Sequence, residues 1–440
     1  SFASVSVLLP VGGGGGGPGG AEGRAVVAAL LIVLNPGLLL LDHVHFQYNG
    51  MLLGLLLLSI GCIARGSRGD PDPMRHVSWD VCGAVLYALL LTMKHLYLIL
   101  APLYFVYLLR RQCFGNFATG KAKFDPGKFA VLAVATGSML LLPFVPFLLQ
   151  PPGAGEQLAQ IFRRLFPFQR GLVHDYWAAN VWALYLFADK CLRFVLRRLG
   201  SVLPPTVRSL VPEGLPDVPP SVAALCLLAG LLPACFRVWS AASSYYSANK
   251  TAVKAGGGGE LFVHAVVFCS FSGFMLAYHV HEKAIMTATI PLTLLATSSR
   301  DHARLYLRTF ALGHFGLLPL LFRPEELLLK VMSYILFMAF AVFALEGVTG
   351  NCVSGQASTG IVTRVDKIWL VILGSVLIFM EVVHPLYLKP RDRLEFLPLM
   401  TTSVVCAVGL VWGWVQSGRM MFGCEWHKSF STGDASRKNI

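Results

Sequence analysis

Charge is scarce in this sequence. Of its 440 residues only 13% are Asp, Glu, Lys or Arg, whereas an ordinary soluble domain carries about 25%. Hydrophobic residues make up 55%, and a soluble protein of that composition would expose large apolar patches. Because a helix of about 20 apolar residues crosses the hydrocarbon core of a bilayer, the composition excludes an ordinary soluble domain and predicts a membrane protein.

The signatures of nucleotide and metal chemistry are also missing. The sequence has no P-loop, no Gly-x-Gly-x-x-Gly between a strand and a helix, no Ser–His–Asp order and no His-Glu-x-x-His. The ten cysteines form no Cys-x-x-Cys pair and no metal-ligand spacing. Most of them lie in or beside apolar stretches, which favours small buried hydrophobic residues. We therefore expect no metal, no cofactor and no nucleotide-dependent chemistry.

The net charge is +13, which in a soluble protein would suggest nucleic-acid binding. Here the basic residues lie in short loops between apolar stretches, which is the pattern of a topology signal. No nucleic-acid-binding module is present in the sequence, so we expect the bilayer and no nucleic acid as a partner.

Twelve apolar stretches predict membrane helices. They cover residues 24–41, 50–64, 77–92, 96–109, 129–149, 221–239, 261–278, 284–298, 303–322, 327–346, 367–384 and 396–415. Several are short, which suits the thin bilayer of the endoplasmic reticulum. The expected fold is an all-α polytopic membrane protein with about 12 membrane helices in residues 24–415. A flexible Gly-rich segment precedes it at 1–23, and a cytosolic basic tail follows at 416–440.

Loop charges predict the orientation of these helices. Loop 110–128 holds Arg110, Arg111, Lys121, Lys123 and Lys128 against Asp125 alone, so the positive-inside rule makes it cytosolic. Loops 65–76, 240–260 and 299–304 and the tail follow on that side, whereas 385–395 comes out luminal despite its basic residues. Alternation then places the polar segments 42–49, 94–95, 151–220 and 279–283 in the lumen. A crossing at 177–188 would invert everything downstream.

The first polar segment is Asp42-His43-Val44-His45-Phe46-Gln47-Tyr48-Asn49-Gly50. Ionisable and amide groups between two spans are costly unless they face water or a partner. Asp42, His45 and Asn49 stand at i, i+3 and i+7, so on a helix they would share one face, suited to sugar hydroxyls or a phosphate. The alternative is interfacial packing at headgroup level, but six polar groups in eight residues favour a functional interpretation.

The second polar segment is His279-Val280-His281-Glu282-Lys283. Lys283 and a histidine can hold a phosphate, and Glu282 can orient a sugar hydroxyl or a His ring. A zinc site is disfavoured because the histidines are i, i+2 and a third ligand is lacking. The alternative is a structural ion pair. Lys94-His95, between two short spans, offers a lysine that either snorkels or touches an anionic head group.

The third polar segment mixes arginines with aromatic residues. Arg163 and Arg164 lead into Phe166-Pro167-Phe168-Gln169-Arg170, and Tyr176, Trp177 and Asn180 follow. Arginines among rings at a membrane interface suit a lipid phosphate flanked by aromatic anchors, although an amphipathic interfacial helix fits equally well. Together the segments imply anionic, lipid-borne substrates reached from the luminal side.

These segments resemble a known family. Asn35-Pro36-Gly37 with residues 42–50 resembles the signature of the dolichyl-phosphate-glucose-dependent glucosyltransferases of N-glycosylation, and residues 279–285 are similar to a second motif of that family. Residues 164–171, Tyr176-Trp177, residues 180–185 and Leu96-Tyr97-Leu98 resemble in particular the branch that adds the second glucose. The resemblance runs from about residue 30 to about residue 415.

The resemblance implies a GT-C fold in the endoplasmic-reticulum membrane with a luminal active face. It implies dolichyl-phosphate-glucose as donor and the monoglucosylated, mannose-rich dolichyl-diphosphate glycan as acceptor, without a metal or a nucleotide sugar. The α-1,3 transfer would be inverting and would need a base and a cationic cradle for the departing phosphate. The alternatives are transfer of the first glucose, a lipid transporter and a non-catalytic membrane fragment.

The resemblance also implies a general base in an acidic first luminal loop. This chain begins at Ser1-Phe2, shortly before a glycine run, and has no counterpart of that loop, so we expect an upstream part to be missing and the base to lie there. Asp42, His281 and Glu282 remain candidate catalytic groups. The candidates for substrate binding are His43, His45, Gln47, Tyr48, Asn49, Lys94, Arg164, Arg170, Tyr176, Trp177, Asn180, His279 and Lys283.

Overall fold

The computed structural model describes residues 20–66, 73–114, 124–149, 151, 153–165, 171–173, 177–200, 214–247, 257–321, 323–350, 360–388 and 394–423. Within these ranges the regular structure is helical, apart from one isolated bridge between Val173 and Val280. The twelve apolar stretches predicted from the sequence coincide with helices. The all-α prediction is thus confirmed for the described part of the chain.

The helices run in the following order, where η marks 3-10 or π-helical turns. The first part of the chain forms α2 (Ala21–Val33), α3 (Pro36–Leu38), η1 (Leu39–Val44), α4 (Asn49–Gly66), α5 (Pro73–Met93), η2 (His95–Leu100), α6 (Ala101–Leu108), η3 (Leu109–Cys113), α7 (Pro126–Leu141), η4 (Leu142–Phe144), α8 (Val145–Leu148), α9 (Ala154–Leu165) and α10 (Val181–Gly200). The remainder forms α12 (Pro220–Ser247), α13 (Gly257–Leu276), η7 (Glu282–Ile285), α14 (Met286–Ala296), α15 (Arg300–Phe315), η8 (Leu318–Leu320), η9 (Pro324–Glu326), α16 (Leu327–Thr349), α17 (Arg364–Ile378), η11 (Phe379–Leu388) and α18 (Leu397–Gly423).

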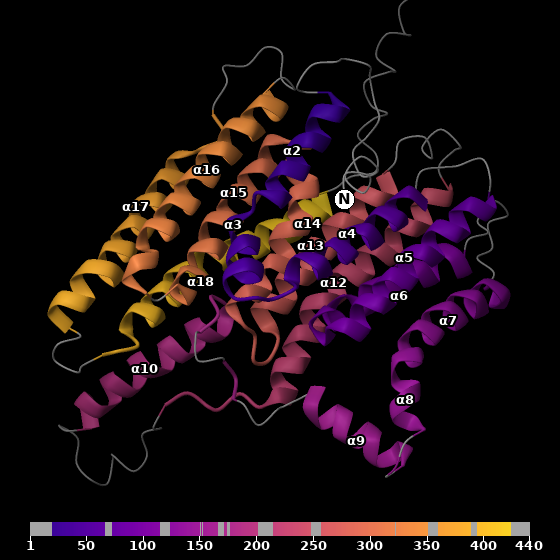
Figure 1. Ribbon diagram of the computed structural model, residues 1–440, viewed down its shortest axis with the longest axis horizontal. Coiled ribbons are helices and arrows are strands. Elements are labelled where there is room, and N and C mark those ends of the chain that lie inside the picture. The colour runs from indigo at the N-terminus through magenta and orange to yellow at the C-terminus, as the bar shows by residue number, and fades with distance from the viewer. Residues whose placement is uncertain are drawn as a thin grey trace, which may run out of the picture.

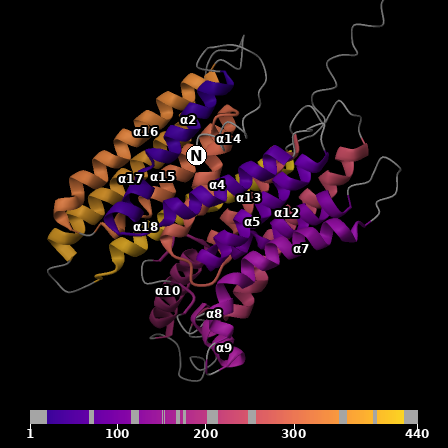
Figure 2. The same ribbon diagram turned by 45° about the vertical axis from the view of Figure 1, so that its right-hand side comes forward.

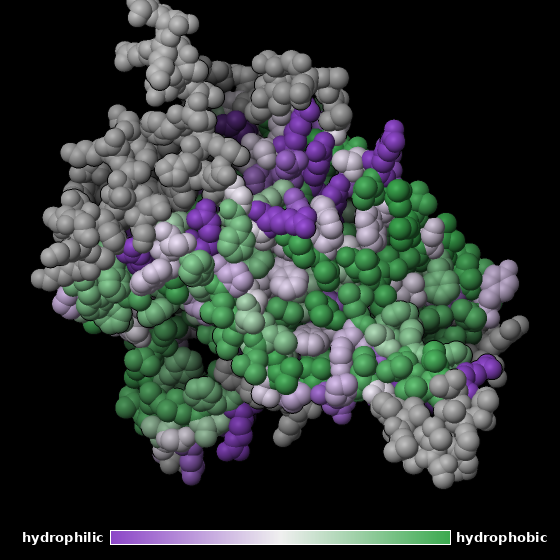
Figure 3. Space-filling view, turned by 180° about the vertical axis from the view of Figure 1, so that it is seen from behind, coloured by the Kyte–Doolittle hydropathy of each residue, from purple (hydrophilic) through white to green (hydrophobic). Residues whose placement is uncertain are grey.

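Eight segments of the described chain are long and apolar enough to cross a membrane. They are Ala21–Val44, Asn49–Gly66, Pro126–Leu148, Pro220–Ala241, Gly259–Leu276, Pro324–Thr349, Arg364–Leu388 and Leu397–Gly423. The other four predicted spans form shorter or more polar helices, so the structure supports a polytopic membrane protein, and the count of twelve stays a prediction. On the face in Figure 3, hydrophobic residues form a broad band, and most of the strongly hydrophilic ones lie above and below it.

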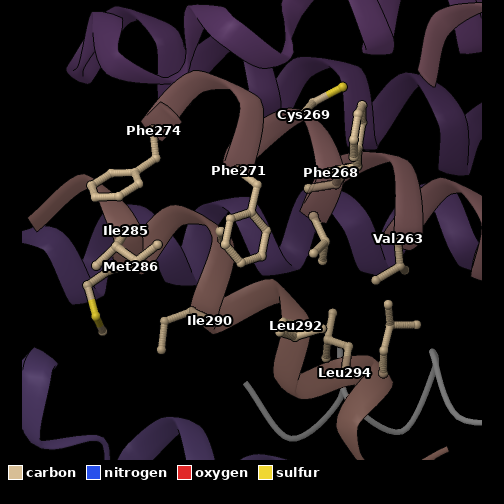
Figure 4. Close-up of a cluster of buried hydrophobic side chains, with 14 of the residues drawn as sticks. Val263, Phe268, Cys269, Phe271, Phe274, Ile285, Met286, Ile290, Leu292 and Leu294 are labelled. Atoms are coloured by element: carbon tan, nitrogen blue, oxygen red, sulfur yellow. The ribbon is translucent and has the colours of Figure 1, made fainter. Parts of the chain in front are cut away.

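Helix α13 occupies the centre of the bundle (Figure 1), where it packs against α12, α14 and α18. Figure 4 shows the rings of Phe271 and Phe274 pointing from α13 toward Ile290 and Ile285, and all four side chains are almost fully buried. Between membrane helices such close packing, and not the expulsion of water, drives association. Cys269 belongs to this core as predicted for the cysteines, whereas Cys82 and Cys191 are exposed.

Described helix ends that flank the predicted basic loops lie at one end of the bundle. Arg111 donates to the carbonyl of Gly66 and, at 2.7 Å, to the carboxylate of Asp80, which links the ends of α4, α5 and η3. The rings of His264 and His302 lie 4.9 Å apart and bring the start of α15 to the start of α13. Charge bias in the loops therefore grouped the correct helix ends.

The described helices between α8 and α12 lie outside the bundle. Helix α10 is not among the eight candidate spans, and both views place α9 and α10 below the bundle (Figures 1 and 2). The chain folds back on α10, because Tyr185 Oη donates to the carbonyl of Pro216 at 2.5 Å. The amide of Leu215 donates to Asp189 at 2.8 Å; hydrogen bonds from Arg193 and then Leu215 hold the pKa of Asp189 below its usual range.

This arrangement predicts opposite accessibility for the two ends of the bundle. His43 and Asp301 are both exposed and lie at opposite ends. In a background without native cysteines, Asp301→Cys should react with an impermeant maleimide in sealed microsomes, and His43→Cys only after permeabilisation. Labelling of both from the same side would contradict the orientation.

Candidate functional site at one end of the bundle

The first polar segment folds into a capped turn. The π-helical turn η1 ends at His45, Phe46 adopts a left-handed φ of 51°, and α4 begins at Asn49. Asp42 Oδ1 accepts hydrogen bonds from the backbone amide of Asn49 at 2.8 Å, and Oδ2 accepts one from the amide of Gly50 at 2.5 Å. Because the first amides of a helix lack internal partners, this carboxylate caps α4.

The predicted common helical face for Asp42, His45 and Asn49 is wrong. The helix is interrupted after η1, so the i, i+3, i+7 spacing does not apply across Phe46. Asp42 and Asn49 still meet, through the cap, and Asn49 Nδ2 also donates to Asp42 Oδ1 at 3.3 Å. The turn therefore brings Asp42 and Asn49 together by hydrogen bonds and not by a shared helical face.

Asn49, which is held by Asp42, in turn positions Lys94. The ammonium of Lys94 donates to Asn49 Oδ1 at 2.8 Å, while Asn49 Nδ2 donates to Gln47 Oε1 at 2.9 Å. Lys94 therefore points into the protein and does not snorkel toward water. The series Asp42, Asn49 and Lys94 connects the start of α4 to the turn between α5 and η2.

A second ammonium faces the same place. Burial, and then repulsion from Lys283, lower the pKa of Lys94 from its usual 10.5, while Asp42 partly offsets this. Burial, followed by the charge of Lys94, likewise lowers the pKa of His95. Two lysines from segments far apart in the sequence thus share one electrostatic environment, and such a pair favours an anion between them.

Glu282 stands between His281 and Lys283 with a buried carboxylate. Only 6% of the residue is exposed, and its Oε2 atom has no hydrogen-bond partner within the described part of the chain. An unpaired buried carboxylate oxygen is costly, so this atom is available to a polar group of a substrate. The Nε2 atom of His45 is likewise buried without a hydrogen-bond partner in the described part of the chain.

The third polar segment joins the second through the main chain. The amide of His279 donates to the carbonyl of Leu172 at 2.8 Å, its ring Nδ1 lies 3.1 Å from the carbonyl oxygen of Gly171, and Val173 bridges to Val280. The His279 and His281 rings lie 5.8 Å apart, edge to face. The region after α9 therefore lies against the segment that carries Glu282 and Lys283.

Asn180 has a structural task. Its Oδ1 accepts from the amides of Trp182 and Ala183 at 3.1 and 3.2 Å, which caps α10, and its Nδ2 donates to the carbonyl of Phe274 at 3.2 Å. With 1% exposure the side chain positions α10 against α13. A hydroxyl that the sequence did not single out, that of Ser403 at the start of α18, donates to the carbonyl of Trp177.

The remaining candidates are less closely gathered. His43 and Tyr48 are exposed on the turn before α4, and Arg164 is exposed on α9. Lys190 lies 5.3 Å from the centre of the Trp177 ring. Arg170 and Tyr176 lie outside the described residues.

Gly50 is needed at the site, although it was not among the candidate residues. A Cβ atom on Gly50 would lie 2.7 Å from Asp42 Oδ2, closer than carbon and oxygen atoms pack. Only glycine leaves room for the carboxylate against the first turn of α4. The sequence signal was present, since a glycine directly follows Asn49 at the start of an apolar helix.

Comparison with known proteins shows the family of the chain. The model of the ALG6, ALG8 glycosyltransferase family matches residues 18–417. The chain is 34% identical over 398 residues to a protein of Mus musculus named dolichyl pyrophosphate Glc1Man9GlcNAc2 alpha-1,3-glucosyltransferase, covering 88% of this chain and 69% of that protein. Proteins of the same name from Gibberella zeae and Arabidopsis thaliana are 34% and 32% identical, with 88% of this chain and 72% and 71% of their lengths covered. The chain therefore belongs to the ALG6, ALG8 glycosyltransferase family.

Proposed function

We propose that this protein transfers glucose from dolichyl-phosphate-glucose to the monoglucosylated, mannose-rich glycan on dolichyl diphosphate, forming an α-1,3 bond. The observation that carries the proposal is the capped turn at Asp42, which fixes Lys94 through Asn49, with Lys283 near enough to repel the Lys94 ammonium. Choice of the second glucose is supported by the names of the relatives, in which the acceptor already bears one glucose.

The two lysines are suited to the phosphate of the donor. Lys94 is held by Asn49, and Asn49 by Asp42, so one ammonium is fixed in place before the donor arrives. Preorganised cations act on charge as it develops, without reorganising during the reaction. When the bond between the anomeric carbon and the phosphate oxygen breaks, the electron pair stays on that oxygen, and the lysines stabilise it.

Asp42 fits positioning better than base catalysis, because both of its oxygens accept hydrogen bonds from the start of α4. Glu282 and His281 remain the catalytic candidates within the described residues, and Glu282 Oε2 is a buried carboxylate oxygen without a hydrogen-bond partner there. In an inverting transfer the acceptor hydroxyl attacks the anomeric carbon, and its proton passes to the base.

We further propose a GT-C arrangement in the endoplasmic-reticulum membrane with the Lys94–Lys283 end in the lumen. The membrane domain would comprise 24–415 with a luminal loop at 151–220, between a Gly-rich segment 1–23 and a cytosolic tail 416–440. Support comes from the grouping of the basic loops at the other end of the bundle and from the positive-inside rule.

The test is glucosyl transfer by the purified chain in nanodiscs, with dolichyl-phosphate-glucose and two acceptors that differ only in the first glucose. We expect transfer onto the monoglucosylated glycan and little onto the non-glucosylated one. Transfer onto the latter alone would favour the first-glucose alternative. A folded protein that transfers to neither acceptor, both as this chain and in a version extended at its N-terminus, would refute the proposal.

The lowered pKa of Lys94 gives a pH prediction. Lys94 should lose its proton below 10.5, so donor binding should weaken as pH rises through that lowered pKa. Lys94→Ala should weaken donor binding about 10-fold to 100-fold, as expected for a lost charge-assisted hydrogen bond. Lys94→Arg should bind with a flatter alkaline limb, because a guanidinium stays charged. Equal pH profiles for Lys94→Arg and wild type would contradict the role.

The capping residues allow a matched comparison. Asp125 caps α7 at the other end of the bundle, accepting from Gly127 and Lys128 at 3.1 Å each, much as Asp42 caps α4. Replacing either by Ala should cost about 0.5–2 kcal/mol of stability. Only Asp42→Ala should also lower kcat/KM, by about tenfold or more, since it releases Asn49 and Lys94. A similar loss of activity in Asp125→Ala would mean that the loss in Asp42→Ala comes from general destabilisation.

A further inference from the structure

A groove lies at the edge of the bundle, far from the polar cluster. Helices α16 and α17 form its walls and α15 its floor (Figure 1, orange). Its volume is about 490 Å³, within the usual range of about 300–1,000 Å³ for a small-molecule site. The lining is mainly apolar, with Leu307 and Ala311 on the floor, Met338 and Val342 on one wall and Trp369 and Leu373 on the other.

The groove opens toward the bilayer. Ile335 and Phe343 of α16 and Leu370 of α17 line it and are 53%, 81% and 41% exposed. Apolar side chains exposed on membrane-spanning helices face lipid. The opening is therefore accessible to a lipid chain from the side.

The length of the groove matches one leaflet. Its lining on α16 runs from Tyr334 to Glu346, which at 1.5 Å per residue is about 18 Å. Half of a hydrocarbon core of about 30 Å is about 15 Å. An extended acyl chain of a single leaflet would fill this length.

Charge gathers at one end of the groove. Arg308 pairs with Asp366 and donates to Thr363 Oγ1 at 3.0 Å, and Arg304 donates to the carbonyls of Gly360 and Ile361. This end carries five basic residues against three acidic ones: Arg300, Arg304, Arg308, Arg364 and Lys367 against Asp301, Glu346 and Asp366. Arg364 and Lys367 do not line the groove but are exposed on the first turn of α17 next to the lining residue Asp366, where their long side chains can reach an anionic head group at the rim.

The charged rim lies at the end of the bundle opposite Lys94 and Lys283. Helix α15 starts at Arg300 beside the rim, and near its other end a Cβ on Gly313 would lie 2.9 Å from Ile285, which follows Lys283 in η7. A lipid anchored at the rim therefore belongs to the other leaflet from the proposed sugar donor.

We propose that this groove binds one acyl chain of an anionic glycerophospholipid, with its phosphate at Arg364 and Lys367. The groove holds α15, α16 and α17 in a fixed relation when the chain is seated. This site is independent of the proposed glucosyl transfer, because none of its lining residues belongs to the polar cluster.

The test is native mass spectrometry of the full chain in mild detergent, with phosphatidylinositol and phosphatidylcholine added as probes. Ala339 lines the groove and is exposed, so Ala339→Trp should fill it; Leu336→Trp, at an exposed position of α16 outside the groove, is the control. We expect one retained phosphatidylinositol in wild type and control, and at least about fivefold less in Ala339→Trp. Arg364→Glu with Lys367→Glu should bring the two lipids to equal retention.

Two results would overturn the proposal. One is wild-type retention of phosphatidylinositol by the double charge variant or by a folded Ala339→Trp variant. The other is a polyprenyl phosphate as the retained molecule, which would make the groove part of substrate binding. The double charge variant lies on the surface, so it tests the proposal even if Ala339→Trp does not fold.

Discussion

The polar end of the bundle depends on where the carboxylate of Asp42 lies. The start of α4 presents unpaired amides and the positive end of a helix dipole, and Asp42 satisfies both. The same contact fixes Asn49, whose side-chain oxygen then places the ammonium of Lys94. The Asp42 side chain thus both caps the amides of α4 and, through Asn49, fixes the position of the Lys94 ammonium. Gly50 makes the close approach of this carboxylate sterically feasible.

Several charges elsewhere in the described part of the bundle are paired. Asp80 is bound by Arg111, Arg308 by Asp366, and Lys330, 4% exposed, lies 2.5 Å from Glu381. Such pairing is the usual way in which ionisable groups are tolerated among membrane helices. The polar cluster differs, because two ammoniums repel each other there and a buried carboxylate oxygen has no partner in the described residues. The combination of two nearby ammoniums and this carboxylate oxygen favours the cluster as the place for an anionic, polar ligand.

The sequence predicted most of the helices, because a long apolar run leaves the backbone no alternative in a bilayer. Loop charges also grouped the helix ends correctly. The site was harder, since its decisive contacts join distant positions: Lys94 to Asn49 across 45 residues, and Ser403 to Trp177 across 226. The left-handed Phe46 could not be foreseen either, because bulky residues rarely adopt that conformation, and it invalidates the helical spacing assumed for His45. Asn180 looked like a ligand by composition and proved to be a cap.

The unpaired oxygen of Glu282 has a consequence for the evolution of the chain. Replacing this residue by an apolar one of similar volume would remove a buried oxygen that lacks a hydrogen-bond partner, and such a replacement would raise stability. Proteins gain thermal resistance most easily at sites where function imposes strain. Selection for heat-stable variants of this protein would therefore accumulate substitutions at Glu282 and its neighbours, and the positions enriched by such a screen would map the residues that activity keeps destabilised.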